Sequence, residues 1–212
     1  MSQVNPEIST STAAPFIPHK LTYEEFLREY DGQYAEYVDD EVIIPMSVTQ
    51  THDNLTNFLS AALRFYVEAK NLGRICGEPY QMKMVLDGKI KGREPDIFFV
   101  KTENLDRVKE QFFDGAADLV IEVISPESVA RDTQDKFEEY EAAGVTEYWL
   151  IDPNRRTANF YAFDGNGKYR LLPISAEGKF ESGIIEGLWI KPEWLWQTLP
   201  GLMEILKEWK LV

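Results

Sequence analysis

A single acidic residue inside a short apolar run limits most strongly what this chain can fold into. The run extends from Leu119 to Ile124 and reads Leu-Val-Ile-Glu-Val-Ile. An almost unbroken apolar run of this length is typical of a central strand that is covered on both faces. Strand alternation places Glu122 on the same face as Val120 and Ile124. Because a buried carboxylate is costly unless it meets a cation or hydrogen-bond donors, we expect Glu122 to face a polar site.

A second acid stands at the start of another apolar strand. Asp96 follows Pro95 and precedes the run from Ile97 to Val100. If this strand lies beside the strand of Glu122, the two carboxylates converge, and their oxygens suit Mg²⁺ or Mn²⁺. Two other interpretations stay open from these residues alone. Asp96 is a turn or strand-entry residue, or Glu122 is a structural acid that pairs with a buried Lys or Arg.

Lys136 is the best candidate for a positive charge beside these acids. A lysine two residues after Glu122 would share its face of the strand, but that position is Ile124. A helix predicted from Glu127 to Ala143 carries Asp132, Lys136 and Tyr140 on one stripe. A bound metal lowers the pKa of a water and offsets charge on a leaving oxygen, and a nearby lysine stabilises developing phosphate charge. In the other interpretation, Lys136 forms only a solvated ion pair with Asp132.

The order of predicted elements favours an α/β (α+β) fold with a mixed β-sheet flanked by helices. The 212 residues suffice for one sizeable core, so we expect one domain over residues 19–212 behind a flexible tail at 1–18. The predicted elements are a helix Tyr23–Tyr30 behind a capping box of Thr22 and Glu25, a hairpin Tyr34–Pro45, a helix Thr51–Asn71, strands Ile75–Leu86, Glu94–Val100, Ala117–Ser125 and Tyr148–Asp152, a hairpin turned at Asp164–Gly167, and an amphipathic helix within Pro192–Leu211.

The charge balance restricts how this chain can meet nucleic acid. It has 22 basic and 36 acidic residues and a formal charge of −14. Phosphate neutralisation requires Lys and Arg, so nucleic-acid binding must rely on a local basic patch, on metal ions or on a second chain. Cys76 is the only cysteine, which excludes an internal disulfide. We expect a cytoplasmic protein, because the sequence has neither a secretory signal nor an apolar run of about 18 residues.

Several motifs together resemble the Uma2 family, also known as DUF820, of restriction-endonuclease-like proteins. The resemblance runs from about Leu21 to Leu188, and the long Glu-Val-x-Ser-Pro to Gly-Val-x-Glu-Tyr-Trp string makes it specific. The residues that carry it are Glu94-Pro95-Asp96-Ile97, Asp118 to Pro126, Asp132, Lys136, Tyr140, Gly144-Val145 and Glu147 to Pro153. One departure is the hairpin turn, which is Asp39-Asp40 where the family usually has Asp-Gly.

The resemblance implies a PD-(D/E)xK fold in which the lysine has moved from the strand to the helix. Asp96 and Glu122 are then the metal ligands, and Lys136 is the catalytic lysine. Glu36 matches an acid expected to join the site, and His52 matches a histidine at the start of the long helix. Cross-strand pairing for Glu36 and a local hydrogen-bonding role for His52 are the alternatives. Enzymes of this type are often homodimers.

Two functions of different classes follow. The first is a Mg²⁺- or Mn²⁺-dependent endonuclease that hydrolyses phosphodiester bonds in DNA. The second is a catalytically silent module of the same fold that acts through protein contacts. The negative charge favours the module, as do four C-terminal tryptophans that could cover a partner, although aromatic residues also fill cores. These are Trp189, Trp194, Trp196 and Trp209. A glycosidase with paired carboxylates is a distant third, because it gives Lys136 no role.

Overall fold

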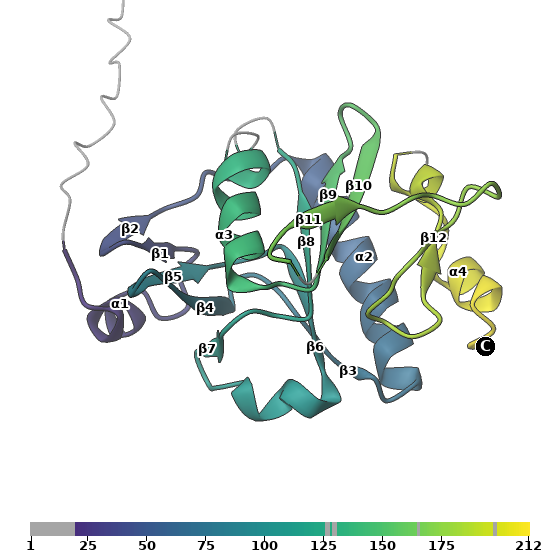
Figure 1. Cartoon of the computed structure of the whole chain (residues 1–212). Coiled ribbons are helices and arrows are strands. Elements are labelled where there is room, and N and C mark those ends of the chain that lie inside the picture. Colours follow the sequence, from purple (N-terminus) through teal and green to yellow (C-terminus); the bar gives the residue numbers. More distant parts are fainter. Residues whose placement is uncertain (1–19, 126–127, 129–130, 165, 197–198) are drawn as a thin grey trace, which may run out of the picture.

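The computed structural model describes residues 20–125, 128, 131–164, 166–196 and 199–212. Its centre is a six-stranded mixed sheet with the order β11-β10-β9-β8-β6-β3, flanked by helices (Figure 1). The mixed α+β architecture agrees with the fold class that the sequence predicts. The expected tail at residues 1–18 lies outside the described residues. The strands of this sheet are β3 (Gly73–Cys76), β6 (Ile97–Lys101), β8 (Leu119–Val123), β9 (Glu147–Asp152), β10 (Thr157–Phe163) and β11 (Tyr169–Leu171).

The acid-bearing strand β8 lies inside this sheet and is buried along its whole length. It pairs parallel with β9 on one side and antiparallel with β6 on the other. Its alternating side chains enter two different hydrophobic clusters: Ile121 and Val123 join one, and Val120 and Ile124 join the other. The alternation read from the sequence is therefore correct, and both faces of the strand are covered.

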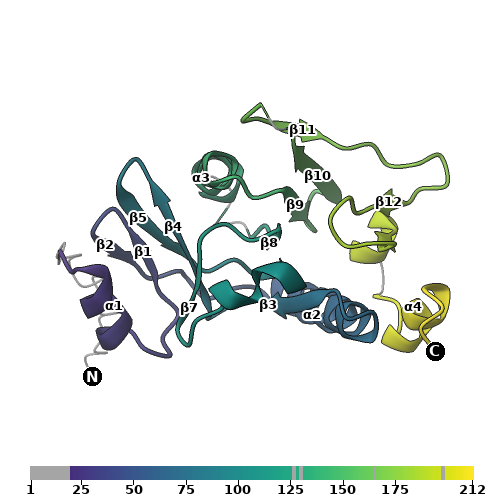
Figure 2. The same cartoon turned by 60° about the horizontal axis from the view of Figure 1, so that its bottom comes forward.

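Helices cover the two faces of the central sheet (Figure 2). Helix α2 (Gln50–Ala69) packs its apolar stripe, which includes Leu55, Leu59 and Leu63, against one face. Helix α3 (Lys136–Ala143) lies on the other face and ends at Gly144, whose φ of +83° suits glycine. No helix within the described residues is long and apolar enough to cross a membrane.

A second, five-stranded sheet has the order β2-β1-β5-β4-β7. The two-residue turn Asp39-Asp40 joins β1 to β2 with φ angles of +54° and +70°, which suit a primed hairpin turn. The Asp-Asp turn therefore forms despite the departure from Asp-Gly. Helix α1 (Tyr23–Glu29) packs on this sheet, and its capping box of Thr22 and Glu25 forms as predicted. The strands are β1 (Glu36–Val38), β2 (Glu41–Ile43), β4 (Gln81–Leu86), β5 (Lys89–Arg93) and β7 (Phe112–Asp114).

The C-terminal region packs against α2. It contains β12 (Phe180–Glu181), β13 (Trp189–Ile190) and α4 (Leu202–Glu208). Trp209 packs against Tyr66 of α2 with ring centroids 5.1 Å apart and donates from Nε1 to the carbonyl oxygen of Trp189 at 2.8 Å. All four C-terminal tryptophans belong to the core cluster around α2 or pack against it. Core packing is therefore the correct interpretation of these residues.

One predicted strand is wrong because the chain changes sheets inside it, and a second begins later than expected. The expected strand Ile75–Leu86 is divided into β3 and β4, which belong to different sheets. The expected strand Glu94–Val100 begins only at Ile97, and the unpredicted strand β5 precedes it in the other sheet. The two crossings lie against each other, since Glu78 N donates to the Pro95 carbonyl oxygen at 3.2 Å. The expected acid Asp96 thus lies at the seam between the two sheets.

The helix predicted from Glu127 to Ala143 is shorter and less regular than expected. Residues 131–135 form a π-helical turn, and the α-helix begins at Lys136. Glu127 itself lies outside the described residues, as does Gly165 in the predicted Asp164–Gly167 turn.

Candidate functional site

Asp96 and Glu122 lie directly beside each other on neighbouring strands. The antiparallel register of β6 and β8 pairs Ile97 with Ile121, so the next positions along each strand, Asp96 and Glu122, face one another. Asp96 is 7% exposed and Glu122 is 2% exposed. Asp96 Oδ2 accepts a hydrogen bond of 2.5 Å from the backbone N–H of Val123, which fixes this carboxylate to the edge of β8. The convergence that the sequence suggested is present.

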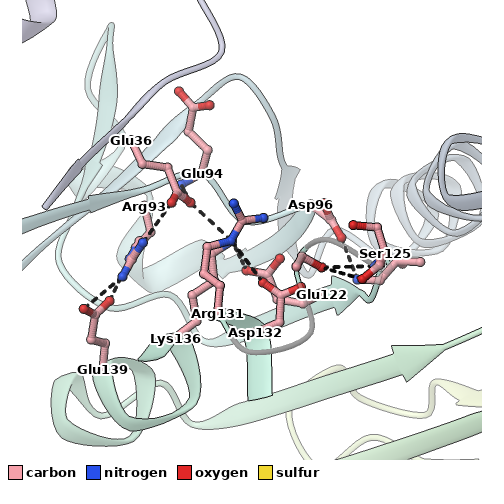
Figure 3. Close-up of polar contacts among 12 residues, drawn as sticks. Glu36, Arg93, Glu94, Asp96, Glu122, Ser125, Arg131, Asp132, Lys136 and Glu139 are labelled. Atoms are coloured by element: carbon pink, nitrogen blue, oxygen red, sulfur yellow. Dashed lines mark hydrogen bonds and ion pairs between the residues drawn. The ribbon is translucent and has the colours of Figure 1, made fainter. Parts of the chain in front are cut away.

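Lys136 reaches the same point from the first turn of α3. Its Nζ donates to Glu122 Oε1 at 2.9 Å and lies 3.3 Å from Glu36 Oε1 (Figure 3). The distance to Asp132 Oδ1 is 3.9 Å, and the lysine side chain is 2% exposed. A solvated pair between Lys136 and Asp132 is therefore the wrong interpretation. The ammonium is shared among buried carboxylates.

Glu36 enters the site from strand β1 and connects it to an arginine. Glu36 Oε2 accepts from Arg93 at 2.8 Å, and Oε1 accepts from the Glu94 backbone N–H at 3.2 Å. Arg93 also forms two bonds with Glu139 of α3, at 2.7 and 3.0 Å. Burial alone would raise the pKa of Glu36, but Lys136 and Arg93 outweigh it and lower this pKa to about 2. Glu36 therefore stays ionised and holds Lys136 from the side opposite Glu122.

His52 contacts the site from the first turn of α2. Its Nε2 lies 3.1 Å from Asp96 Oδ2, and the residue is 4% exposed. Burial lowers the pKa of His52, but the hydrogen bond and charge of Asp96 raise it more, so the net direction is upward. The imidazole faces Asp96, and it is the backbone N–H of His52 that caps the helix on Thr49 Oγ1 at 3.3 Å. His52 is therefore placed to orient Asp96.

Glu78 and Arg93 were not predicted at the site, whereas Tyr140 was predicted on the stripe of Lys136 without a stated partner. Tyr140 donates to Glu122 Oε1 at 2.7 Å, so the tyrosine of the predicted stripe supports the same oxygen as Lys136. Glu78 accepts from the Tyr34 hydroxyl. Burial, followed by the charge of Asp96, raises the pKa of Glu78 to about 9. The sequence places Glu78 directly before Pro79, inside the expected strand Ile75–Leu86, and gives no other signal for it.

Among the described residues of the site, Lys136 is the one buried lysine, and its ammonium faces three carboxylates. Burial raises the pKa of Glu122 to about 8; Lys136 opposes this increase, whereas Asp96 and Asp132 add to it. The pKa of Lys136 lies above its ordinary value, because Glu122, Glu36 and Asp132 outweigh its burial. A charged Lys136 is compatible with a raised Glu122 pKa, since one ammonium is shared by three carboxylates. A further cation would favour the ionised form of Glu122.

A pocket of about 130 Å³ opens beside the two central carboxylates. Asp96, Glu122, His52 and Asp132 line its interior, together with Arg131. The Arg131 side chain is 26% exposed and lies 3.5 Å from Asp132 Oδ1. The loop before α2 supplies the apolar rim with Ile44, Pro45, Met46 and Val48. The pocket therefore combines two facing acids with one accessible guanidinium.

The donor set fits a hard divalent cation. Asp96 and Glu122 offer carboxylate oxygens from adjacent strands, and Mg²⁺ commonly binds one or two carboxylates and keeps several waters. Lys136 and Tyr140 both donate to Oε1 of Glu122, so these two bonds do not engage Oε2. The described residues contain no group of three or more His, Cys, Asp or Glu side chains arranged to hold a metal ion. The fit is thus to an ion whose remaining ligands are water or substrate.

Comparisons with known proteins give a family match and a shared fold. The model of the Uma2 family, described as "Putative restriction endonuclease", matches residues 22–193. The chain is also similar to a solved structure from Anabaena variabilis ATCC 29413, described as "a putative nuclease belonging to DUF820", with 19% identity and a TM-score of 0.66. That match covers 85% of this chain and 99% of the other, and it shows a shared fold. No curated protein matches.

Proposed function

Because this chain belongs to the Uma2 family of restriction-endonuclease-like nucleases, we propose that it is a Mg²⁺- or Mn²⁺-dependent nuclease that hydrolyses phosphodiester bonds in DNA. The observation that carries the proposal is the pair of facing carboxylates, Asp96 and Glu122, with the buried Lys136 ammonium 2.9 Å from Glu122. If Glu122 had only a structural role, Lys136 would suffice as its partner. The second acid in register, and the pocket that both acids line, are what a metal site requires.

Asp96 and Glu122 would hold the metal ion. When bound, such an ion binds a phosphate oxygen, lowers the pKa of a water and offsets charge on the leaving oxygen. The bonds from Val123 N–H and His52 fix one Asp96 oxygen, and those from Lys136 and Tyr140 fix one Glu122 oxygen. Preorganised ligands of this kind need no rearrangement when charge develops.

Lys136 and Arg131 would supply the two positive charges. The Lys136 ammonium, held between Glu122 and Glu36, sets a fixed positive potential next to the acids. Arg131 lies at the pocket and is partly exposed, so its guanidinium can meet a phosphate oxygen. A formal charge of −14 opposes DNA binding over a broad surface, so the proposed phosphate contacts are confined to this site.

Of the two observations that favoured a catalytically silent module of the same fold, one remains. The overall negative charge still favours it, but the C-terminal tryptophans pack against α2 and its core cluster. A homodimer would let two sites meet the two strands of a duplex. We include it in the proposal, with light scattering of the purified protein as its test.

Metal binding and cleavage test the proposal together. Calorimetric titration with Mn²⁺ and Mg²⁺ should show binding in the parent and loss in Asp96→Asn and Glu122→Gln. Plasmid cleavage should fall at least about 100-fold in both variants. The matched control is Glu181→Gln, an exposed strand glutamate in β12, which should bind and cleave like the parent. Equal cleavage by the parent and Asp96→Asn would refute the nuclease assignment. Absence of metal binding both with and without DNA would favour the silent module.

A further inference from the structure

A second pocket lies under the C-terminal end of α1, beside the segments that lead into β4 and β7. It encloses about 560 Å³, a volume suited to a small organic molecule. Three aromatic side chains, Phe26, Tyr30 and Tyr80, contribute to its walls. Phe26 and Tyr30 stack with ring centroids 5.3 Å apart, and Pro79 and Tyr80 also line the pocket. The proposed metal site uses none of these side chains.

A buried carboxylate lies at the floor of this pocket. Glu94 is 2% exposed and is among the lining residues. Its neighbour Arg93 points to Glu36 and Glu139, and strand alternation sends Glu94 the other way. Figure 3 shows the Glu94 carboxylate pointing away from the cluster around Lys136.

One oxygen of this carboxylate lacks the partner that burial demands. Glu94 Oε2 has no hydrogen-bond partner among the described residues. The adjacent Gln81 side chain accepts from the Tyr23 hydroxyl at 2.9 Å and donates one N–H to the Ala35 carbonyl oxygen at 2.7 Å, and neither bond reaches Glu94 Oε2. A buried acceptor left unpaired is unfavourable, so a donor that enters the pocket would be favoured.

The acidic residues that line the pocket favour a cationic ligand. Asp31 and Glu110 lie at its rim in addition to Glu94 at its floor, and the described residues that line it include no Lys or Arg. Asp31 and Glu110, without a balancing cation among the described lining residues, disfavour phosphate and other anions. A ligand that is cationic, planar and rich in N–H donors would satisfy the charge, the aromatic walls and the unpaired oxygen together.

We propose that this pocket binds a guanidinium group carried on an alkyl chain. The flat guanidinium stacks on aromatic faces, donates to Glu94 Oε2 and is more weakly hydrated than an ammonium. The alkyl chain packs along Leu27 and Pro79 on its way out. A free small molecule and an arginine side chain of a partner protein present the same chemistry. The site is independent of the proposed nuclease activity.

The test uses the full chain and a matched ligand series. N-acetyl-argininamide is titrated by calorimetry or NMR, alongside the neutral citrulline analogue and the lysine analogue. Saturable binding of the arginine compound is expected, and both analogues should bind at least about tenfold more weakly. Glu94→Gln should weaken binding at least about tenfold, and Tyr30→Ala should weaken it by removing one wall. The rim variant Glu110→Gln should change the affinity by less than about threefold.

A capped pentapeptide with one central arginine separates the two sources. Tighter binding of the peptide than of the capped amino acid assigns the site to a partner protein, and equal binding assigns it to a small molecule. Equal affinity for the citrulline analogue overturns the proposal, as does parental affinity in Glu94→Gln. No saturation by either probe at about 10 mM also overturns it. If Glu94→Gln fails to fold, the ligand series and Tyr30→Ala still decide the outcome.

Discussion

Replacing Lys136 with methionine should destabilise the fold strongly, because it removes the one ammonium shared by the buried acids. Nζ lies 2.9 Å from Glu122 Oε1 and 3.3 Å from Glu36 Oε1 in a side chain that is 2% exposed. Each contact is worth roughly 5 kcal/mol in gross Coulomb energy at an effective dielectric constant of about 20. Desolvation of the ions offsets much of this, and breaking a buried pair costs about 3–5 kcal/mol net.

Two features of the site place the expected loss near the lower end of this range. Glu36 keeps its bond to Arg93 at 2.8 Å, so it stays partly neutralised in the variant. Burial raises the pKa of Glu122 to about 8, so this carboxyl readily holds a proton at pH 7 and its contact with Lys136 is weaker than the gross Coulomb energy of two full charges. We therefore expect a loss of about 3 kcal/mol at pH 7.

The assay is urea unfolding of the parent, Lys136→Met, Glu122→Gln and the double variant. The double variant should be less destabilised than the sum of the single variants, with a coupling of about 1–3 kcal/mol. The matched control is Lys168→Met. Lys168 also pairs with a glutamate, Glu141, at 2.6 Å, but its side chain is 75% exposed, so its removal should leave the urea midpoint almost unchanged. A loss below about 1 kcal/mol in Lys136→Met, or single effects that add within about 0.5 kcal/mol, would refute the reasoning.

Three further predictions concern neighbouring parts of the site. Glu36 has a folded pKa of about 2 against an ordinary value of 4.5, so it should contribute about 3 kcal/mol of stability above pH 4.5 that is lost as the pH falls towards 2. The stability difference between the parent and Glu36→Gln should therefore shrink on acidification, and a constant difference from pH 6 to pH 3 would contradict this. Gly77→Ala should cost about 2 kcal/mol or more in urea unfolding, because a Cβ there would lie 2.3 Å from the Asp96 carbonyl oxygen; parental stability would show that this crossing has more room. Arg131→Ala should weaken DNA binding and reduce the salt slope by about 1, and an unchanged slope would remove Arg131 from the phosphate contacts.

The central acids of the site could be found from local sequence alone. Glu122 stood out because it interrupts a strand that is apolar on both faces, and Asp96 because it precedes another such strand. The helical spacing of Asp132, Lys136 and Tyr140 placed the lysine and tyrosine on one stripe. Each of these inferences uses only the period of a strand or a helix, which the order of residues encodes directly.

The partners of these acids could not be found in this way. Arg93 and Glu78 lie at the two crossings between sheets, where the expected strand Ile75–Leu86 is divided and the expected strand Glu94–Val100 begins only at Ile97. A local pattern reports whether a residue is buried, but not which strand pairs beside it or where the chain leaves one sheet for another. Those choices depend on contacts between residues far apart in the chain.

The sequence by itself therefore determined several of the elements, the buried faces of β8 and the identities of the central acids and the lysine. Only the tertiary structure decided that β6 pairs with β8 so that Asp96 meets Glu122, and that Lys136 lies between Glu122 and Glu36. It also decided that Glu94 faces a separate pocket. The physical reason is that periodicity is a property of neighbouring residues, whereas register and charge sharing arise from long-range packing.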